Sequence, residues 1–360
     1  MVSDTPLFVG VTGLQAGFDP SPGLAVARAL RRMSLPNLRL IGLDYDPACT
    51  GLFAEDLFEA CYVLPWQPTS TDTLEALLAI KRALGLDVFI PCLDSDVHYW
   101  SRMQTELYQN NISVLLPSYQ SLTRCTKTAL VDLAPLVGMD VPPTIVCHDW
   151  AEVEASLEVI SPPAIIKGFF SGTLIGSNRD MLEVQARAVA RVLGYPIVIQ
   201  AFVQGEEYSV CGLANQQSEC IVTICQKKIG ITDEGSTWMG VTVDSPELNG
   251  ICKLLVQELG WVGPFDVDIL RDKDNRSWLL LDFNPRFPSW VDGAINAGIN
   301  MPTVALELMV QLPEMRNVSA TSGIVVVKDF EDIMLRMSEL GANIWEGDQD
   351  ERYASMYRRV

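Results

Sequence analysis

Histidine is scarce in this chain of 360 residues, and the two that occur are His98 and His148. The nine cysteines are scattered, and no two of them form a C-x-x-C pair. Zinc sites are built mainly from clusters of these two residue types, and a nucleophilic cysteine needs a histidine beside it. The composition therefore argues against a zinc site. It predicts free, buried thiols in a protein of the reducing cytoplasm.

Basic residues are also under-represented, with 26 Lys and Arg against 45 Asp and Glu and a net charge of −19. Such a charge repels nucleic acids and anionic membrane surfaces at long range, so neither is expected as a partner. No apolar run reaches the roughly 20 residues needed to span a bilayer. The first eleven residues show no cationic stretch followed by a long apolar run, so no signal peptide is predicted.

The composition that remains, 48% hydrophobic and 20% charged, is typical of a folded protein with two or three modules. Strands alternate with helices in the first part, and the predicted strands are 7–14, 38–44, 87–94 and 112–117. This alternation predicts a small doubly wound parallel sheet, with ligand-facing loops at the carboxyl ends of the strands. Asp94 and Asp96 would lie at such an end.

From about Ser118 the pattern changes to that of an α+β module. A helix is expected over 120–137, followed by extended segments and hairpin-like strands. The last 40 residues are expected to contain a strand at 323–329 and a helix at about 330–341.

The strongest chemical signal is a hairpin at 265–286 that carries Asp268 on its first strand and Asp282 and Asn284 on its second. Residues 282 and 284 are two apart, so their side chains share a face, and antiparallel pairing can bring Asp268 alongside them. Three oxygen ligands on one face suit Mg²⁺. Arg286, just beyond, can hold a phosphoryl group with its fork of donors. The alternative is a solvated acidic hairpin.

The same segment, V-D-I-L followed by L-D-F-N-P-R, resembles the metal-binding end of the ATP-grasp superfamily. The resemblance implies that Asp268, Asp282 and Asn284 are Mg²⁺ ligands and that Arg286 contacts the phosphate and the intermediate. Asp282 stands where the family usually has Glu. Aspartate is one methylene shorter than glutamate, which disfavours the bridging of two metal ions by its two oxygens.

Further upstream, P-P-A-I-I-K-G-F-F-S-G-T-L-I-G-S (162–177) resembles the strand, lysine and glycine-rich loop that cover the ATP phosphates in this superfamily. The resemblance makes Lys167 a catalytic and phosphate-binding residue. It assigns nucleotide contacts to four loop residues: Ser171, Gly172, Thr173 and Gly176. Lys127 matches an earlier phosphate-contacting residue by its position.

The segment Q-A-F-V-Q-G-E-E-Y-S-V (200–210) resembles the superfamily's hinge strand for adenine and ribose. It implies that backbone groups of Ala201, Phe202 and Val203 hold the adenine, with Gln200 in the usual Glu position. Glu207 would accept hydrogen bonds from the ribose hydroxyls.

Residues 7–117 and the stretch 284–302 resemble the carbamoyl-phosphate-synthetase and biotin-carboxylase branch, in which the segment after the arginine lines the acceptor site. Ser289, Trp290 and Asp292 are the substrate candidates that this implies, although Trp290 is equally compatible with core packing. The expected fold is an N-terminal doubly wound parallel sheet followed by a two-lobed ATP-grasp fold. The expected divisions are 1–117 (pre-ATP-grasp), 118–203 (small lobe), 204–315 (large lobe with the metal site) and 316–360 (C-terminal extension).

The activity implied is that of a stand-alone carboxylate–amine ligase that uses ATP and Mg²⁺, with Mn²⁺ able to substitute. It would phosphorylate the carboxylate of an amino acid or peptide and couple the acyl-phosphate to an amine. A homodimer is compatible with the resemblance. The alternatives are a nucleotide-binding regulator or pseudoenzyme, which the residues Asp282 and Gln200 keep open, and an enzyme with a thiol, bicarbonate or other non-amine acceptor.

Overall fold

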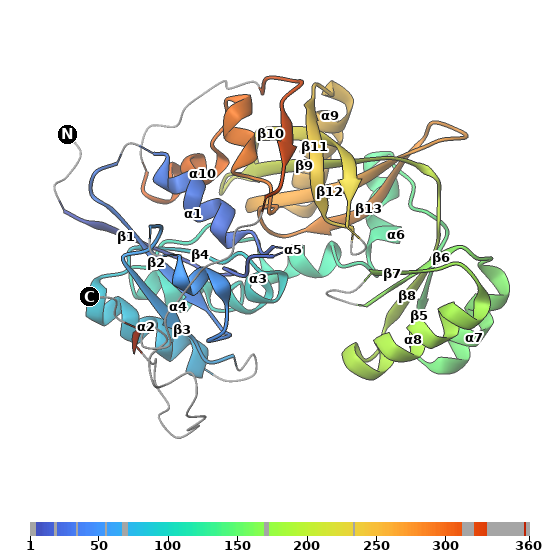
Figure 1. Cartoon of the computed structure of the whole chain (residues 1–360), viewed down its shortest axis with the longest axis horizontal. Coiled ribbons are helices and arrows are strands. Elements are labelled where there is room, and N and C mark those ends of the chain that lie inside the picture. Colours follow the sequence, from blue (N-terminus) through green and yellow to red (C-terminus); the bar gives the residue numbers. More distant parts are fainter. Residues whose placement is uncertain are drawn as a thin grey trace. The chain divides into compact units, whose positions relative to one another are not determined.

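The computed structural model describes residues 5–17, 20–33, 35–54, 56–66, 71–168, 173–232, 235–311 and 320–329, together with the strand Met356–Tyr357 (Figure 1). The chain forms two compact units. The first comprises Met1–Leu116, Arg286–Ser319 and Lys328–Val360, and the second comprises Pro117–Pro285 and Ala320–Val327. The residues that follow Pro285 therefore group with the N-terminal residues and not with the hairpin that precedes them.

The first unit is built on a five-stranded sheet with the order β15-β3-β2-β1-β4. Its strands are β1 (Leu7–Val11), β2 (Leu38–Asp44), β3 (Ala60–Val63), β4 (Val88–Ile90) and β15 (Met356–Tyr357). Strands β1 to β4 pair in parallel, which confirms the predicted parallel sheet, and β15 pairs with β3 in the antiparallel sense. The strand predicted at 112–117 is wrong, since only Ser113 makes a single bridge to Val88.

Among the described residues of this unit, the α-helices are α1 (Gly23–Arg31), α2 (Asp72–Leu84), α3 (Asp94–Trp100), α4 (Gln104–Gln109) and α10 (Met301–Met309). Helix α1 begins in direct contact with the turn that follows β1. A Cβ atom on Gly23 would lie 2.0 Å from the carbonyl oxygen of Thr12, so only glycine fits there. The backbone N–H of Gly23 donates to the carbonyl of Gly13 at 2.8 Å, which closes the turn.

The second unit begins with a broken helical segment where a single helix was predicted. The structure has α5 (Tyr119–Arg124), α6 (Leu130–Leu133) and a 3₁₀ turn, η2 (Ala134–Val137). The prediction of one helix over 120–137 is therefore wrong in its middle. Thr123 and Thr126 hydrogen-bond backbone carbonyls three residues back, a competition with regular helix geometry that is characteristic of threonine. Lys127 lies in the break.

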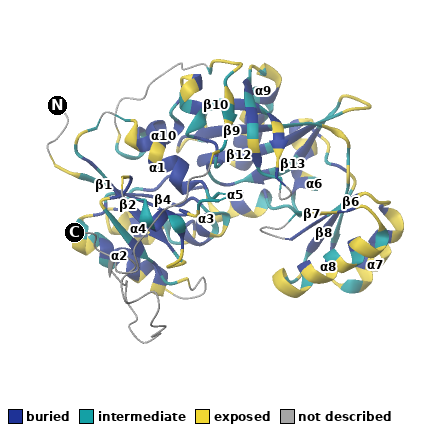
Figure 2. Ribbon diagram, viewed as in Figure 1, coloured by how far each residue is buried: buried dark blue, intermediate teal, exposed yellow. Residues whose placement is uncertain are grey.

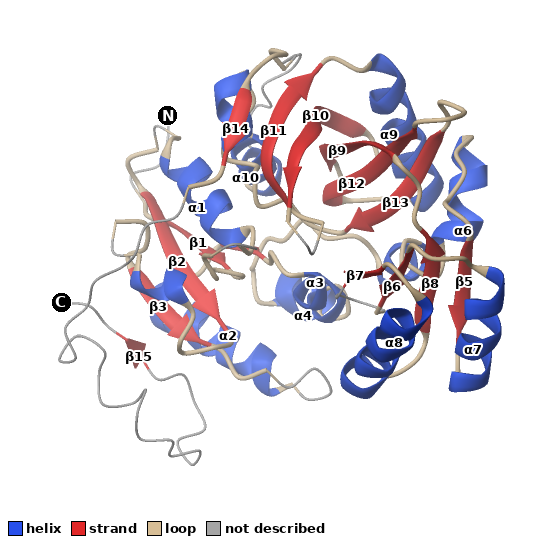
Figure 3. Cartoon of the chain, turned by 45° about the vertical axis from the view of Figure 1, so that its right-hand side comes forward, coloured by secondary structure: helices blue, strands red, loops and turns tan. Residues whose placement is uncertain are grey.

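A four-stranded antiparallel sheet with the order β5-β8-β6-β7 forms the small lobe of the second unit. Its strands are β5 (Thr144–Cys147), β6 (Ala164–Lys167), β7 (Thr173–Gly176) and β8 (Ile197–Ala201). The helices α7 (Trp150–Val159) and α8 (Arg179–Leu193) cover one face of this sheet (Figure 3). Ile166, Ile197 and Ile199 pack beneath them, and the outer sides of both helices are exposed (Figure 2).

A six-stranded sheet with the order β13-β12-β9-β10-β11-β14 forms the large lobe. Its strands are β9 (Gly205–Ala214), β10 (Cys220–Ile231), β11 (Thr237–Val243), β12 (Gly263–Asp272), β13 (Trp278–Asn284) and β14 (Val325–Val327). Helix α9 (Pro246–Leu259) packs on one face, and Ser245 caps its N-terminus. Strand β14 lies within the strand predicted at 323–329, and the helix predicted at 330–341 lies outside the described residues.

Within the part of the chain that the structure describes, every helix is too short or too polar to cross a bilayer.

Asp96 lies fully buried at the carboxyl end of the parallel sheet in the first unit. The hydroxyl of Thr12 donates to its Oδ2 atom at 2.5 Å, while no described residue hydrogen-bonds its Oδ1 atom. Burial raises the pKa of Asp96 to about 7, although the hydrogen bonds from Thr12 and Tyr45 oppose this rise. A carboxyl group with this pKa binds a proton in the folded state at pH values where the unfolded chain has released it.

We expect Asp96→Asn to change how stability depends on pH. Between the unfolded pKa near 4 and the folded pKa near 7, the folded wild type binds more protons than the unfolded chain, so its stability falls as pH rises. The asparagine variant lacks this titration. Its melting temperature relative to wild type should therefore increase from about pH 4 to about pH 7 and then level off. A difference that is constant across this range would show that Asp96 is ionised in the folded protein.

Candidate active site

The centre of the candidate site is a pair of carboxylates that face each other across two strands of the large sheet. Asp268 on β12 is the direct cross-strand partner of Asp282 on β13, and Asp266 is the partner of Asn284. By strand alternation these four side chains share one face of the sheet. The hydroxyl of Ser209 donates to Asp266 at 2.5 Å. The structure thus brings together the three residues predicted as metal ligands.

A β-bulge at Leu281 sets this pairing. Ile269 pairs with Leu280, whereas Asp268 pairs with Asp282, so β13 carries one extra residue at this point. Without the bulge Leu281 would stand opposite Asp268, and Asp282 would turn to the other face of the sheet. The carbonyl oxygen of Leu281 accepts a hydrogen bond from the Nζ atom of Lys167 at 3.1 Å.

Lys228, on β10, is the cation closest to Asp268. Its Nζ atom lies 2.8 Å from Asp268 Oδ1 and 3.4 Å from Glu207 Oε2, and it donates to the carbonyl of Gly235 at 3.0 Å. Its side chain is only 3% exposed. Burial alone would lower the pKa of Lys228, but the carboxylates of Asp268 and Glu207 outweigh burial and raise it. Burial also raises the pKa of Glu207, an effect that Lys228 opposes.

Lys167 and Lys127 complete the group of lysines. Lys167 ends β6 of the small lobe, and its buried side chain reaches across to the large sheet. Burial lowers the pKa of Lys167, and the charge of Asp282 opposes this fall. Lys127 Nζ lies 3.5 Å from Asp282 Oδ2. Three lysines from three different segments therefore converge on the carboxylates of the large sheet.

The predicted adenine segment, Ala201 to Val203, forms the link between β8 and β9. Its backbone is held by hydrogen bonds from the N–H of Ala201 to Pro143 O at 2.8 Å and from the N–H of Phe202 to Pro163 O at 3.2 Å. Gln200, in the preceding strand, donates from Nε2 to Thr144 Oγ1 at 2.8 Å, and its Oε1 atom is buried without a partner among the described residues. Gln200 is thus bound to the small sheet through one end of its amide.

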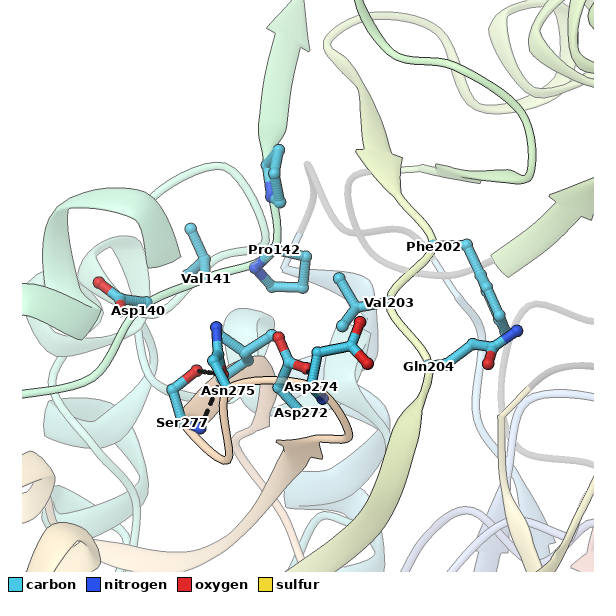
Figure 4. A pocket seen from close by; sticks show the side chains of 12 residues that line it. Asp140, Val141, Pro142, Phe202, Val203, Gln204, Asp272, Asp274, Asn275 and Ser277 are labelled. Atoms are coloured by element: carbon cyan, nitrogen blue, oxygen red, sulfur yellow. Dashed lines mark hydrogen bonds between the residues drawn. The ribbon is translucent and has the colours of Figure 1, made fainter.

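A cavity of about 620 Å³ lies beside this link. The residues Phe202 to Gln204, Pro142 and the acidic turn between β12 and β13 are among those that line it (Figure 4). Neither the lysines nor the paired carboxylates belong to its lining. The cavity therefore lies beside the predicted adenine segment, and its lining is separate from the lysines and the paired carboxylates.

Two of the predicted loop contacts, Ser171 and Gly172, lie outside the described residues. Thr173 begins β7 and pairs with Lys167. Gly176 ends β7, where a Cβ atom would lie 2.5 Å from the side chain of Leu182 on α8. Close packing against the helix is therefore sufficient to explain this glycine.

The remaining predicted residues lie in the first unit. Arg286 pairs with Asp94, with 3.1 Å between Nε and Oδ1. Ser289 accepts a hydrogen bond from Lys328 Nζ at 2.6 Å. Asp292 is partly buried, and burial raises its pKa, while Arg28 opposes this rise. Trp290 is only 4% exposed, as expected for a residue of the core.

Sequence reasoning missed two residues of the large sheet, Lys228 and Gln226. Both lie on β10 and, two apart, share the face that carries Asp268. Gln226 is fully buried, and neither atom of its amide has a hydrogen-bond partner among the described residues. The sequence Gln-Lys-Lys at 226–228 does not show which of the two lysines lies on the face of Asp268. Only the pairing of β10 with β9 reveals this.

The donor set fits a hard divalent cation. No group of three or more His, Cys, Asp or Glu side chains among the described residues is arranged to hold a metal ion. The predicted set is of another kind, with two carboxylates and the amide oxygen of Asn284. That set suits Mg²⁺, which takes few protein ligands and completes its shell with phosphates and water.

Comparison with known proteins places the fold in a recognised class. Solved structures with this architecture include the biotin carboxylase domain of 2-oxoglutarate carboxylase from Hydrogenobacter thermophilus, in complex with MgADP, ADP and bicarbonate (TM-score 0.66, 12% identity, 87% of this chain and 71% of that one). Another is the L-amino acid ligase of Bacillus licheniformis (TM-score 0.61, 16% identity, 87% and 76%). The chain has the ATP-grasp fold, as the sequence predicted.

Part of the chain also matches a family model and a curated relative by sequence. Residues 195–332 match the family described as ATP-grasp in the biosynthetic pathway with Ter operon. A curated relative, the D-alanine–D-alanine ligase of Chromohalobacter salexigens, is 25% identical over 193 residues, which cover 48% of this chain and 60% of that protein. The chain thus spans less than two thirds of the length of this relative.

We expect Gln226→Met to stabilise the protein. A buried amide without partners carries a desolvation penalty of about 1–3 kcal/mol, which a methionine of similar shape avoids. Denaturant unfolding should show a higher midpoint for the variant with an unchanged slope. A lower midpoint would mean that the Gln226 amide is hydrogen-bonded in solution.

Proposed function

We propose that this protein is an ADP-forming ligase that activates a carboxylate with ATP and couples it to an amine. The observation that carries the proposal is the convergence of Lys127, Lys167 and Lys228 on the carboxylates of one sheet face. Phosphoryl transfer is catalysed mainly by positioning and charge neutralisation, and this arrangement supplies both.

In this proposal the nucleotide lies between the small and large lobes of the second unit. Backbone groups of Ala201 to Val203 would hold the adenine, and Glu207 would accept hydrogen bonds from the ribose. Lys127 and Lys167 would balance the charge of the phosphates. Nucleotide binding is supported by the fold, since the biotin carboxylase domain of the same fold is seen with ADP and MgADP.

Asp268, Asp282 and Asn284 would hold Mg²⁺. The ion, when bound, would neutralise charge on the phosphate oxygens during transfer. Asp282 and Asn284 keep their places through the β13 ladder, because Asp282 pairs with Asp268 and Asn284 with Asp266. The chain's own contribution is this fixed register of oxygen donors.

The chemistry proceeds in two displacements. A carboxylate oxygen of the substrate attacks the γ-phosphorus, and ADP leaves. The nitrogen of a neutral amine then attacks the acyl carbon, inorganic phosphate leaves, and the nitrogen releases its extra proton. Arg286, two residues beyond Asn284 in the chain, would stabilise the negative charge of the acyl-phosphate and of the tetrahedral adduct.

An amino acid or a peptide is the proposed substrate. Two proteins similar to this chain are named for ligating amino acids, the D-alanine–D-alanine ligase and the L-amino acid ligase. Ser289 and Asp292 are the proposed contacts for the substrate. A cytoplasmic location, where ATP and amino acids are available, and a homodimer belong to the same proposal.

We expect Mg-ATP to raise the melting temperature of the wild type. Nucleotide at a hundred times its dissociation constant stabilises by about 2.7 kcal/mol. Asp282→Ala should lose the magnesium-dependent part of this stabilisation, because it removes a metal ligand. Differential scanning fluorimetry with ATP and ADP, each with and without Mg²⁺, measures both effects. An absence of any shift in the wild type would contradict the ligase proposal.

We expect Arg286→Lys to slow ADP release by on the order of a hundredfold, because the compact ammonium of lysine cannot reproduce the planar fork of guanidinium donors. The assay measures ADP release with pairs of L-amino acids and with dipeptides as substrates. Arg124→Lys, which changes a surface pair with Glu258, is the matched control and should keep wild-type rates. Nucleotide stabilisation should persist in both variants. Equal rates for the Arg286 and Arg124 variants would exclude Arg286 from the reaction.

A further inference from the structure

Each carboxylate of the proposed nucleotide site already has a lysine as its partner. Lys228 lies 2.8 Å from Asp268 and 3.4 Å from Glu207, and Lys127 lies 3.5 Å from Asp282. These are the carboxylates that the proposed function assigns to the metal ion and to the ribose. A lysine ammonium beside such a carboxylate repels a metal ion that approaches it.

Lys228 is held firmly in this position. An ammonium group has three N–H donors, and Lys228 has three acceptors: Asp268, Glu207 and the carbonyl of Gly235. Its neighbour Lys227 differs, since it faces the other side of the strand and pairs with Glu206, and its side chain is 35% exposed. The two adjacent lysines therefore provide a comparison within one strand.

The charges explain why the arrangement would exclude a free metal ion. Asp268 and Asp282 stand directly opposite each other, and like charges in such a pair repel unless cations compensate them. Lys228 compensates the charge of Asp268, and Lys127 compensates the charge of Asp282. A divalent cation entering alone would meet two ammonium groups at close range and would have to displace at least one of them.

We propose that Lys127 and Lys228 neutralise the metal-binding carboxylates until nucleotide arrives, and that the metal enters only together with the nucleotide. The phosphates offer both lysines new anionic partners, which releases Asp268 and Asp282 to the metal ion that the nucleotide carries. This inference rests on the proposed function, since it concerns the same site. It adds an order of binding, in which the metal–nucleotide complex is the species recognised.

The test measures Mn²⁺ binding in the absence of nucleotide. Binding is detected as the loss of the free-ion signal in electron paramagnetic resonance. The wild type should bind weakly, and Lys228→Met should bind on the order of tenfold more tightly or better, because the competing charge is gone. Lys227→Met, the matched control on the other face of β10, should behave as the wild type. Wild-type binding as tight as that of Lys228→Met would overturn the proposal.

Lys228→Met leaves two partly buried carboxylates without their lysine and can fail to fold for that reason. A second variant keeps the proposal testable in that case. Lys127→Met, at a less buried position, should also tighten Mn²⁺ binding, through Asp282 alone. In the presence of a non-hydrolysable ATP analogue, the wild type should bind Mn²⁺ and both variants should bind the analogue more weakly. If the wild type binds no nucleotide, the proposed function fails; if it binds nucleotide but also binds free Mn²⁺ tightly, only the order of binding fails.

Discussion

Repulsion between Asp268 and Asp282 is the constraint around which the second unit is arranged. Two carboxylates placed directly opposite each other in an antiparallel pair destabilise a sheet unless cations lie nearby. The chain supplies those cations from separate places, Lys228 from β10 of the same sheet and Lys127 from a break in a helical segment. These two ion pairs place a positive charge beside each of the facing carboxylates.

The bulge at Leu281 connects this charge pair to the small lobe. It turns Asp282 onto the face of Asp268, and the carbonyl of Leu281 is the acceptor for Lys167. One extra residue in β13 thus sets the face of Asp282, which is proposed as a metal ligand, and supplies the acceptor for a lysine from another sheet. Bulges are frequent beside active sites, where the extra residue changes the direction in which a side chain points.

Much of the architecture could be predicted because it depends on local patterns. Strand β2 occurs at the residues expected from the alternation of strands and helices. The helix predicted over 120–137 failed because threonine hydroxyls bond the nearby backbone, an effect that periodicity does not register. The strand predicted at 112–117 failed because an apolar segment can be buried without joining the sheet beyond one bridge. The roles of the candidate site residues, including Arg286 and Asp292, remain predictions.

The sequence by itself determined which residues of the hairpin are the candidate metal ligands, since the identity and spacing of Asp268, Asp282 and Asn284 are properties of the chain alone. It also determined the parallel sheet of the first unit, through alternating strands and helices. Only the tertiary structure decided that Asp282 faces Asp268, because the face of a side chain depends on a register that one bulge residue reverses. It alone decided that Lys228 and not Lys227 joins the site, because strand pairing selects the face on which each lysine lies.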